Sequence, residues 1–225
     1  MTTILLVHGA IADGSSWSKV IPILQHAGHE AIAVQQPLSS IPDDVATVRG
    51  VLDELEGPVV VVGHSFGGVV ITQVAHDAPN VSALVYVAAF APDEGESAQG
   101  LGEPFGQLPS ASHFKIDKRG RFTLPQDVFP QYFCPDVDSQ EARVLAAVQG
   151  ASDVARFGFV SGPPAWREHP THFVVAENDQ IIPPDLERFG AQRMGATTTS
   201  VPGAGHLVMI SQPRAVADAI LAAAG

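Results

Sequence analysis

The chain has 225 residues and a formal charge of −12, from 24 acidic and 12 basic side chains. This length suffices for one domain with a buried core and a small insertion, and two complete domains are not expected. The negative field repels phosphate backbones and anionic lipid headgroups, so we expect neither a nucleic-acid nor a membrane partner. The single cysteine, Cys134, excludes an internal disulfide and offers no cysteine metal cluster.

Uninterrupted apolar runs are short throughout the chain. Ile4–Val7 and Val59–Val62 are examples, and both are far below the ~20 residues that a membrane-spanning helix needs. The N-terminus lacks a charged segment followed by a long apolar one. A single cysteine also fits a reducing compartment. We therefore expect a soluble, cytoplasmic protein without a targeting signal.

Apolar strands alternate with helical segments along most of the chain. In the first part of the chain we expect strands at Thr3–Val7, Ala31–Val34, Val59–Val62 and Ala83–Ala88, separated by helices at Ser16–Gln25, Asp43–Leu55 and Val69–Ala75. In the last part we expect a strand at His172–Ala176, a helix at Leu186–Met194, a strand at Thr197–Val201 and a final helix from Pro213 or Arg214 to Ala223. Asp43 or Asp44 is expected to start the second helix. Parallel strands need crossover connections, so this order predicts an α/β fold with about six parallel strands flanked by helices.

The interval 91–168 breaks this alternation. It holds many of the prolines and glycines, most of the aromatic residues and one expected helix, Ser139–Val148. A long irregular stretch inside a compact domain is usually a functional loop, and disordered segments are poor in aromatics. We therefore expect an inserted lid at 91–168 on a core formed by residues 1–90 and 169–225, with a floppy insertion as the alternative.

The hexapeptide Gly-His-Ser-Phe-Gly-Gly at residues 63–68 follows a run of four valines and matches the G-x-S-x-G nucleophile elbow. A serine at the apex of a tight strand-to-helix turn has a strained backbone, and only small residues such as Gly63 and Gly67 fit on either side. The alternative is an ordinary bend that happens to contain a serine. The buried strand before the motif and the apolar helix after it favour the elbow, so Ser65 is the predicted nucleophile.

A serine hydroxyl needs a base, and the base needs a group that orients it. His206 follows the last expected strand in a glycine-rich loop, the best setting among the nine histidines. Asp179 follows the preceding strand and is the predicted acid, with Glu177, Asp185 and Asp93 as rivals. Taken singly, His206 could be a loop histidine and Asp179 a turn residue. The chain order Ser, Asp, His is that of α/β-hydrolases and favours a triad.

An oxyanion formed on a substrate carbonyl requires backbone N–H donors. The amide of Phe66 begins the helix after the elbow, where unpaired N–H groups favour negative charge. Ala10, directly after the first strand, is the expected second donor. We expect His8 to be a structural hydrogen-bonding residue. His64 is not expected to be the base, because adjacent residues at an elbow point apart.

These motifs together resemble the α/β-hydrolase superfamily, and within it the small plant-type esterase and hydroxynitrile lyase group with its bacterial relatives. The resemblance rests on residues 8–10, 13–17, 27–29, 63–68, 90–93 and 205–209. It implies a sheet that begins at the third strand of larger members, a lid inserted after the fourth strand, and neither cofactor nor metal.

Hydroxynitrile lyases of this group carry a lysine directly after the catalytic histidine, where this chain has Leu207. The resemblance therefore implies a serine esterase that cleaves small carboxylic esters through an acyl-enzyme. Three alternatives stay open: a hydroxynitrile lyase, a cofactor-free perhydrolase on the same site, and a ligand-binding receptor with the hydrolase fold. A homodimer is one option for the oligomeric state.

Overall fold

The computed structural model describes all 225 residues and contains a six-stranded parallel sheet in the order β2-β1-β3-β4-β8-β9. Its strands are β1 Thr3–Val7, β2 Glu30–Val34, β3 Val59–His64, β4 Val81–Val87, β8 Thr171–Ala176 and β9 Thr197–Val201. All six expected strands are present, which confirms the α/β class. β4 begins two residues earlier than expected, because Val81 pairs with Val59 before a register shift in the ladder.

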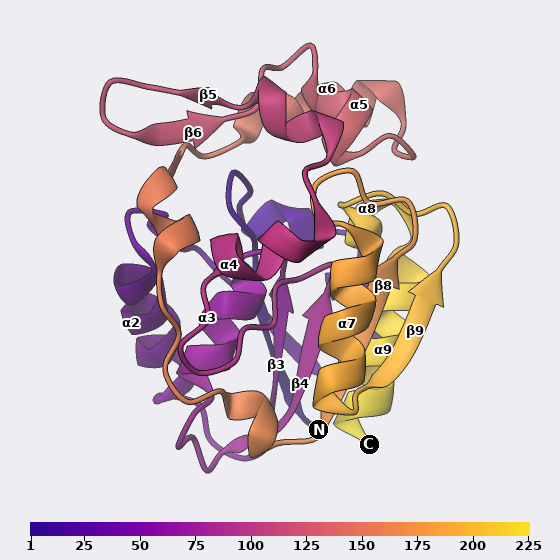
Figure 1. The fold of residues 1–225 in the computed structure, drawn as a ribbon. Coiled ribbons are helices and arrows are strands. Elements are labelled where there is room, and N and C mark those ends of the chain that lie inside the picture. Colours follow the sequence, from indigo (N-terminus) through magenta and orange to yellow (C-terminus); the bar gives the residue numbers. More distant parts are fainter.

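Helices cover both faces of this sheet. They are α1 Ile21–His26, α2 Ile41–Leu52, α3 Gly67–Val74, α7 Pro184–Met194, α8 Val208–Ser211 and α9 Pro213–Ala224. In Figure 1, α7 lies in front of β8 and α9 lies behind it, and α9 also packs on β3 and β4. None of these helices has the length and apolar character needed to cross a bilayer.

Four of the expected helices start elsewhere, and α2, α3 and α7 each begin two residues before the expected start. The helix expected at Ser16–Gln25 is a 3-10 turn at Gly14–Trp17 followed by α1, which begins only at Ile21 with Pro22 in its first turn. Proline is tolerated there because the first N–H groups of a helix have no intrahelical acceptor. Ser40 is the N-cap of α2, and its hydroxyl accepts the N–H of Asp43 at 3.1 Å. Asp43 and Asp44, expected to help start this helix, lie in its first turn.

α2 also ends at Leu52, three residues before the expected end at Leu55. The side-chain amide of Asn80 donates to the carbonyl oxygens of both Leu52 and Leu55, at 3.1 Å each. These bonds tie Asn80, just before β4, to the end of α2 and to the turn that follows it.

The centre of the sheet is buried on both faces, and its two edge strands, β2 and β9, are not. Every residue of β3 is buried, whereas β9 is buried only at Val201. A strand covered on both faces is expected to be continuously apolar, as the four valines of β3 are. Since all the strands are parallel, the loops after β1, β3, β4, β8 and β9 leave the sheet at the same end.

The 91–168 segment is folded rather than floppy. Its helices are α4 Ala98–Gly102, α5 Phe129–Phe133 and α6 Ser139–Val148, its strands β5 Lys115–Ile116, β6 Arg121–Thr123 and β7 Ser152–Asp153, and its 3-10 turns Glu103–Phe105, Pro109–His113, Val154–Gly158 and Ala165–Arg167. The expected bounds of α6 are confirmed. Figure 1 shows β5, β6, α5 and α6 gathered at one end of the molecule, beyond α8. Aromatic side chains of this segment, including Phe122, Phe129 and Phe133, belong to the common core.

A buried ion pair fastens this segment to the core. Nη2 of Arg156 lies 2.9 Å from Oδ2 of Asp44, and both side chains are almost completely buried. Oδ1 of Asp44 accepts the N–H of Leu38 at 2.9 Å. Burial raises the pKa of Asp44 and lowers that of Arg156, although each partner opposes the shift of the other. The pair therefore depends on both members being present, because each charge is taken out of water.

Replacing Arg156 by alanine should destabilise the fold strongly, because it leaves the Asp44 carboxylate buried without its partner. We expect a loss of about 3–5 kcal/mol in the free energy of unfolding, measured by urea titration at neutral pH. Arg214→Ala is the matched control: it removes an exposed ion pair with Asp218 and should cost less than about 1 kcal/mol. Equal losses in the two variants would contradict this role of Arg156.

Candidate active site

Ser65 sits in a left-handed turn between β3 and α3. Its φ is 55°, a value that residues other than glycine seldom adopt. Three backbone hydrogen bonds hold this conformation: the N–H of Ser65 donates to the carbonyl of Val87 at 3.2 Å, and its carbonyl accepts the N–H groups of Gly68 at 3.0 Å and Phe90 at 3.2 Å. The predicted elbow geometry is therefore present, and the end of β4 helps to build it.

The glycines around Ser65 are required by close backbone contacts. A Cβ atom would lie 2.6 Å from the carbonyl oxygen of Gly67 at position 63, 2.5 Å from that of Val7 at position 67, and 2.2 Å from that of Phe90 at position 68. Real Cβ atoms do not approach backbone oxygens so closely. Only glycine lets α3 enter between the ends of β1 and β4 and present Ser65 at its N-terminus.

Asp179 and His206 form a buried hydrogen-bonded pair. Nδ1 of His206 lies 2.6 Å from Oδ2 of Asp179, and both side chains are fully buried. Oδ1 of Asp179 accepts the backbone N–H groups of Ile181 at 2.6 Å and Ile182 at 3.0 Å. A carboxylate that accepts these amides also accepts a hydrogen bond from Nδ1–H, so the ring proton stays on Nδ1 and Nε2 is the basic nitrogen of the ring. Nε2 is buried and has no hydrogen-bond partner.

The rival acids are engaged elsewhere. Asp93 forms an ion pair with Arg167 at 2.7 Å. Glu177 and Asp185 both pair with Arg188, Asp185 at 2.6 Å. Of the four acids considered from the sequence, Asp179 alone contacts His206.

The two histidines next to the motifs hold the backbone, as expected. Nδ1 of His8 donates to the carbonyl of Gly9 at 2.8 Å, and its Nε2 accepts the N–H of Gln36 at 3.1 Å. Nε2 of His64 lies 3.0 Å from the carbonyl oxygen of His206. Burial lowers the pKa of both rings, so both are neutral. His64 therefore fixes the main chain of His206 and does not act as a base towards Ser65.

A cavity of about 620 Å³ opens beside Ser65. Ser65, Ala10 and Phe66 line it from the core, together with Phe90, Ile181 and others, and most of the remaining lining comes from the 91–168 segment. The lining contains no lysine, arginine or histidine, and its one charged residue is Glu103. The amides of Ala10 and Phe66 donate to no acceptor within the chain, and the Ser65 hydroxyl forms no hydrogen bond, including none with His206.

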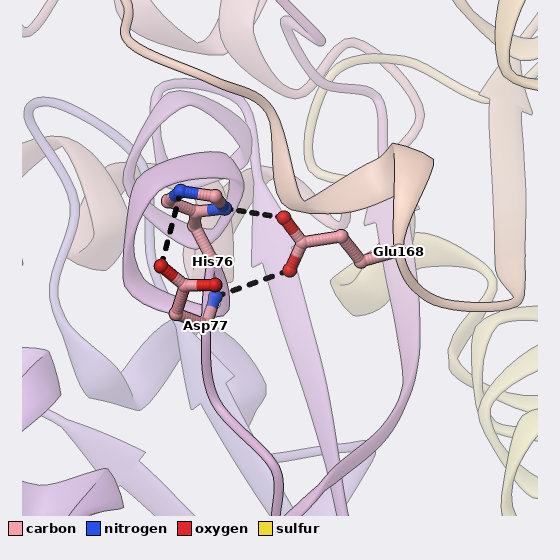
Figure 2. A group of neighbouring side chains, drawn as sticks. All are labelled: His76, Asp77 and Glu168. Carbon is pink, nitrogen blue, oxygen red and sulfur yellow. Dashed lines mark hydrogen bonds and ion pairs between the residues drawn. The ribbon is translucent and has the colours of Figure 1, made fainter.

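A second group of titratable side chains lies at the far end of α3 from Ser65. Figure 2 shows His76 between Asp77 and Glu168: Nδ1 pairs with Glu168, Nε2 lies 3.4 Å from Oδ2 of Asp77, and the N–H of Asp77 donates to Glu168 at 3.1 Å. These residues could bind a metal only by giving up the contacts that they already make. We therefore assign them a structural role, tying the end of α3 to the segment before β8.

Cys134 is buried beside the site and is not part of it. Burial raises the pKa of its thiol to about 12, so it stays protonated and packs as a small apolar group.

A strained serine at a strand-to-helix elbow, a buried histidine and aspartate pair and an apolar cavity together define a hydrolase-type site. The chain matches the model of the alpha/beta hydrolase family over residues 4–219, and it belongs to this family.

Relatives of this chain are named for several activities. Alpha-hydroxynitrile lyase of Arabidopsis thaliana is 26% identical over 98% of this chain and 96% of its own length. Polyneuridine aldehyde esterase of Rauvolfia serpentina is 24% identical over 96% of this chain and 93% of its own. Its crystal structure superposes with a TM-score of 0.87 at 18% identity, covering 100% of both chains. A pyrethroid hydrolase from Sphingobium faniae JZ-2 reaches 0.85 at 23% identity, covering 98% of this chain and 96% of its own. The predicted resemblance is thereby confirmed.

Sequence reasoning missed two buried charged residues that shape this region. Arg156 faces the ring of Phe66, with its guanidinium carbon 5.5 Å from the ring centroid, besides pairing with Asp44. Glu187 lies on the buried face of α7 with Gly190 and Ala191. An acidic residue at helical spacing from small buried residues is a signal that could have identified Glu187.

Adding one methyl group at Gly68 should damage the elbow, because the new Cβ would meet the carbonyl oxygen of Phe90 at 2.2 Å. We expect Gly68→Ala to lose about 1–3 kcal/mol of unfolding free energy in urea titrations. Gly50→Ala is the matched control: Gly50 lies in α2 with open space around its Cβ, so this variant should gain about 0.5–1 kcal/mol. An unchanged stability in Gly68→Ala would contradict the close approach of the two backbones.

Proposed function

We propose that the protein is a serine esterase that cleaves small carboxylic esters through an acyl-enzyme on Ser65, with His206 as the base and Asp179 as the orienting acid. The observation that carries this proposal is the unpartnered Nε2 of His206, whose ring is held by a buried Asp179 on the Nδ1 side. Nothing else in the chain uses this basic nitrogen, and the chemistry of a serine nucleophile needs one.

In the proposed reaction, the Ser65 oxygen attacks the ester carbonyl while Nε2 of His206 takes the hydroxyl proton. The protonated ring then gives that proton to the leaving alcohol. In the second half of the reaction, water attacks the acyl-enzyme carbonyl while Nε2 of His206 takes a proton from the water, and the ring then returns this proton to the Ser65 oxygen as the carboxylic acid leaves. The carboxylate of Asp179 stabilises the imidazolium. Ser65 and His206 lack a hydrogen bond in the unliganded protein, and such catalytic bonds commonly form only when the substrate is bound.

The amides of Ala10 and Phe66 are the proposed oxyanion donors. Both residues line the cavity beside Ser65, and neither amide has an acceptor within the chain. Phe66 is also the N-cap residue of α3, where the helix dipole favours negative charge. Removing one such donor typically costs about 10²–10³ in kcat.

The cavity favours neutral, apolar esters. Its volume of about 620 Å³ lies within the range of small-molecule sites. No lining residue carries a positive charge that could pair with a substrate carboxylate. In this proposal the 91–168 segment acts as the lid, because most of the lining residues belong to it. The esterase and hydrolase names of several relatives accord with this assignment.

Hydrolysis is favoured over cyanohydrin cleavage by the surroundings of His206. Leu207 is buried, and its N–H donates to the carbonyl of Phe133 at 3.2 Å. Neither Leu207 nor the cavity lining offers a cation that could stabilise a cyanide leaving group. A receptor function would not require the basic Nε2 that the His206 and Asp179 pair maintains.

Ser65→Ala and His206→Ala should each lower kcat/KM for p-nitrophenyl acetate by at least about 10³-fold, because each removes a group that takes part directly in the acylation of Ser65. The controls are Ser139→Ala and His26→Ala, which change exposed residues away from the cavity and should keep wild-type rates. A fluorophosphonate should label the wild type and not Ser65→Ala. Full activity in Ser65→Ala, or no labelling of the wild type, would overturn the proposal, and the second result would favour a receptor.

A further inference from the structure

A second buried acid lies behind Asp179. Glu187 is on α7, and its side chain is fully buried. Its Oε2 accepts the N–H of Ala176, the last residue of β8, at 2.9 Å, whereas its Oε1 is buried without a hydrogen-bond partner. The carbonyl oxygen of Ala176 accepts the N–H of Asp179 at 3.1 Å, so the same residue at the end of β8 ties both acids together, and the Asp179 carboxyl is a neighbour of the Glu187 carboxyl.

The two acids are not neutralised by a basic residue. Asp179 pairs only with His206, and Glu187 takes part in no ion pair. The nearest other charge is Glu177, which is partly exposed and paired with Arg188. Two adjacent carboxylates buried with a neutral imidazole would leave two uncompensated negative charges, so one acid must hold a proton.

The donors around the two acids decide where this proton resides. Asp179 accepts three N–H groups, from Ile181, Ile182 and His206. Glu187 accepts one. Hydrogen bonds from N–H groups favour the charged form of a carboxyl group, so the proton belongs on Glu187. Burial, and then the charge of Asp179, raise the pKa of Glu187 well above its ordinary value.

We propose that Glu187 is a positioning residue that remains a neutral carboxylic acid and donates its Oε1 hydroxyl proton to the Asp179 carboxylate. This inference rests on the proposed roles of Asp179 and His206. The donated hydrogen bond completes the set of groups that hold Asp179 and gives the orphaned Oε1 a partner. It also limits the buried negative charge beside His206 to one unit.

The neutrality of Glu187 makes a prediction about stability that does not require enzyme activity. Between the ordinary pKa of 4.5 and the raised native pKa, the native state holds a proton that the unfolded state has released. This proton therefore contributes a loss of about tenfold in the folding equilibrium constant per pH unit as the pH rises through this window. The buried neutral rings of His8 and His64, whose pKa values are lowered, contribute the opposite slope, and their contribution cancels when the wild type is compared with a variant at position 187. Glu187→Gln lacks this proton, so its stability relative to the wild type should rise tenfold per pH unit.

The experiment combines this urea titration, from about pH 5 to pH 7, with infrared spectroscopy of the carboxylic acid C=O band. We expect the wild type to show a band that Glu187→Gln lacks. Glu177→Gln is the control, because it removes a nearby negative charge and leaves Glu187 in place, so it should keep both the band and the wild-type slope. A wild type without the band, or a stability ratio that does not change with pH, would overturn the proposal.

The pH dependence of kcat/KM and the size of kcat test whether Glu187 positions Asp179. Glutamine is isosteric with the neutral acid and can donate its amide N–H to Asp179, so Glu187→Gln should keep the acidic limb of kcat/KM where the wild type has it. Glu187→Leu cannot donate, and it should lower kcat at least about 10-fold with little change in KM. An acidic limb that moves to lower pH in Glu187→Gln would mean that Glu187 is ionised. A wild type that shows no esterase activity would refute the proposed function alone, because neither the infrared band nor the pH dependence of stability requires esterase activity.

Discussion

The buried hydrogen bond between Asp179 and His206 is the interaction on which the site depends. Neither group could be buried alone without a large cost, and together they satisfy each other with the help of two backbone amides. The parallel pairing of β8 with β9 brings the loops after these two strands to one end of the sheet. The fold thus holds a histidine in a defined tautomer, as the chemistry proposed for Ser65 requires.

The rest of the architecture presents Ser65 and covers it. Gly63, Gly67 and Gly68 allow close backbone approaches that larger residues would block, and the left-handed turn of Ser65 is held by bonds to β4 and the residues after it. The 91–168 segment supplies most of the cavity wall, and the Arg156 and Asp44 pair fastens it to α2. Strain at the serine is therefore offset by ordinary hydrogen bonds and packing around it.

Features that depend on local pattern could be predicted from the sequence, and features that depend on distant pairing could not. The valine run at 59–62 and the helix at 139–148 follow from hydrophobic periodicity. The elbow and the order of the acid and the histidine follow from motif chemistry. The strands β5, β6 and β7 have only two or three residues each, too few for any periodicity to be visible. Asp44 and Arg156 are 112 positions apart, and no local sequence pattern predicts their pairing.

The tautomer of His206 tests the central claim most directly. In ¹⁵N NMR of the wild type at neutral pH, the account predicts a ring with its proton on Nδ1 and an unprotonated Nε2, because the Asp179 carboxylate accepts from Nδ1. Asp179→Asn should shift the proton to Nε2, since an amide group can donate to Nδ1. A wild-type His206 that carries its proton on Nε2 would contradict the claim that this pair prepares a base for Ser65.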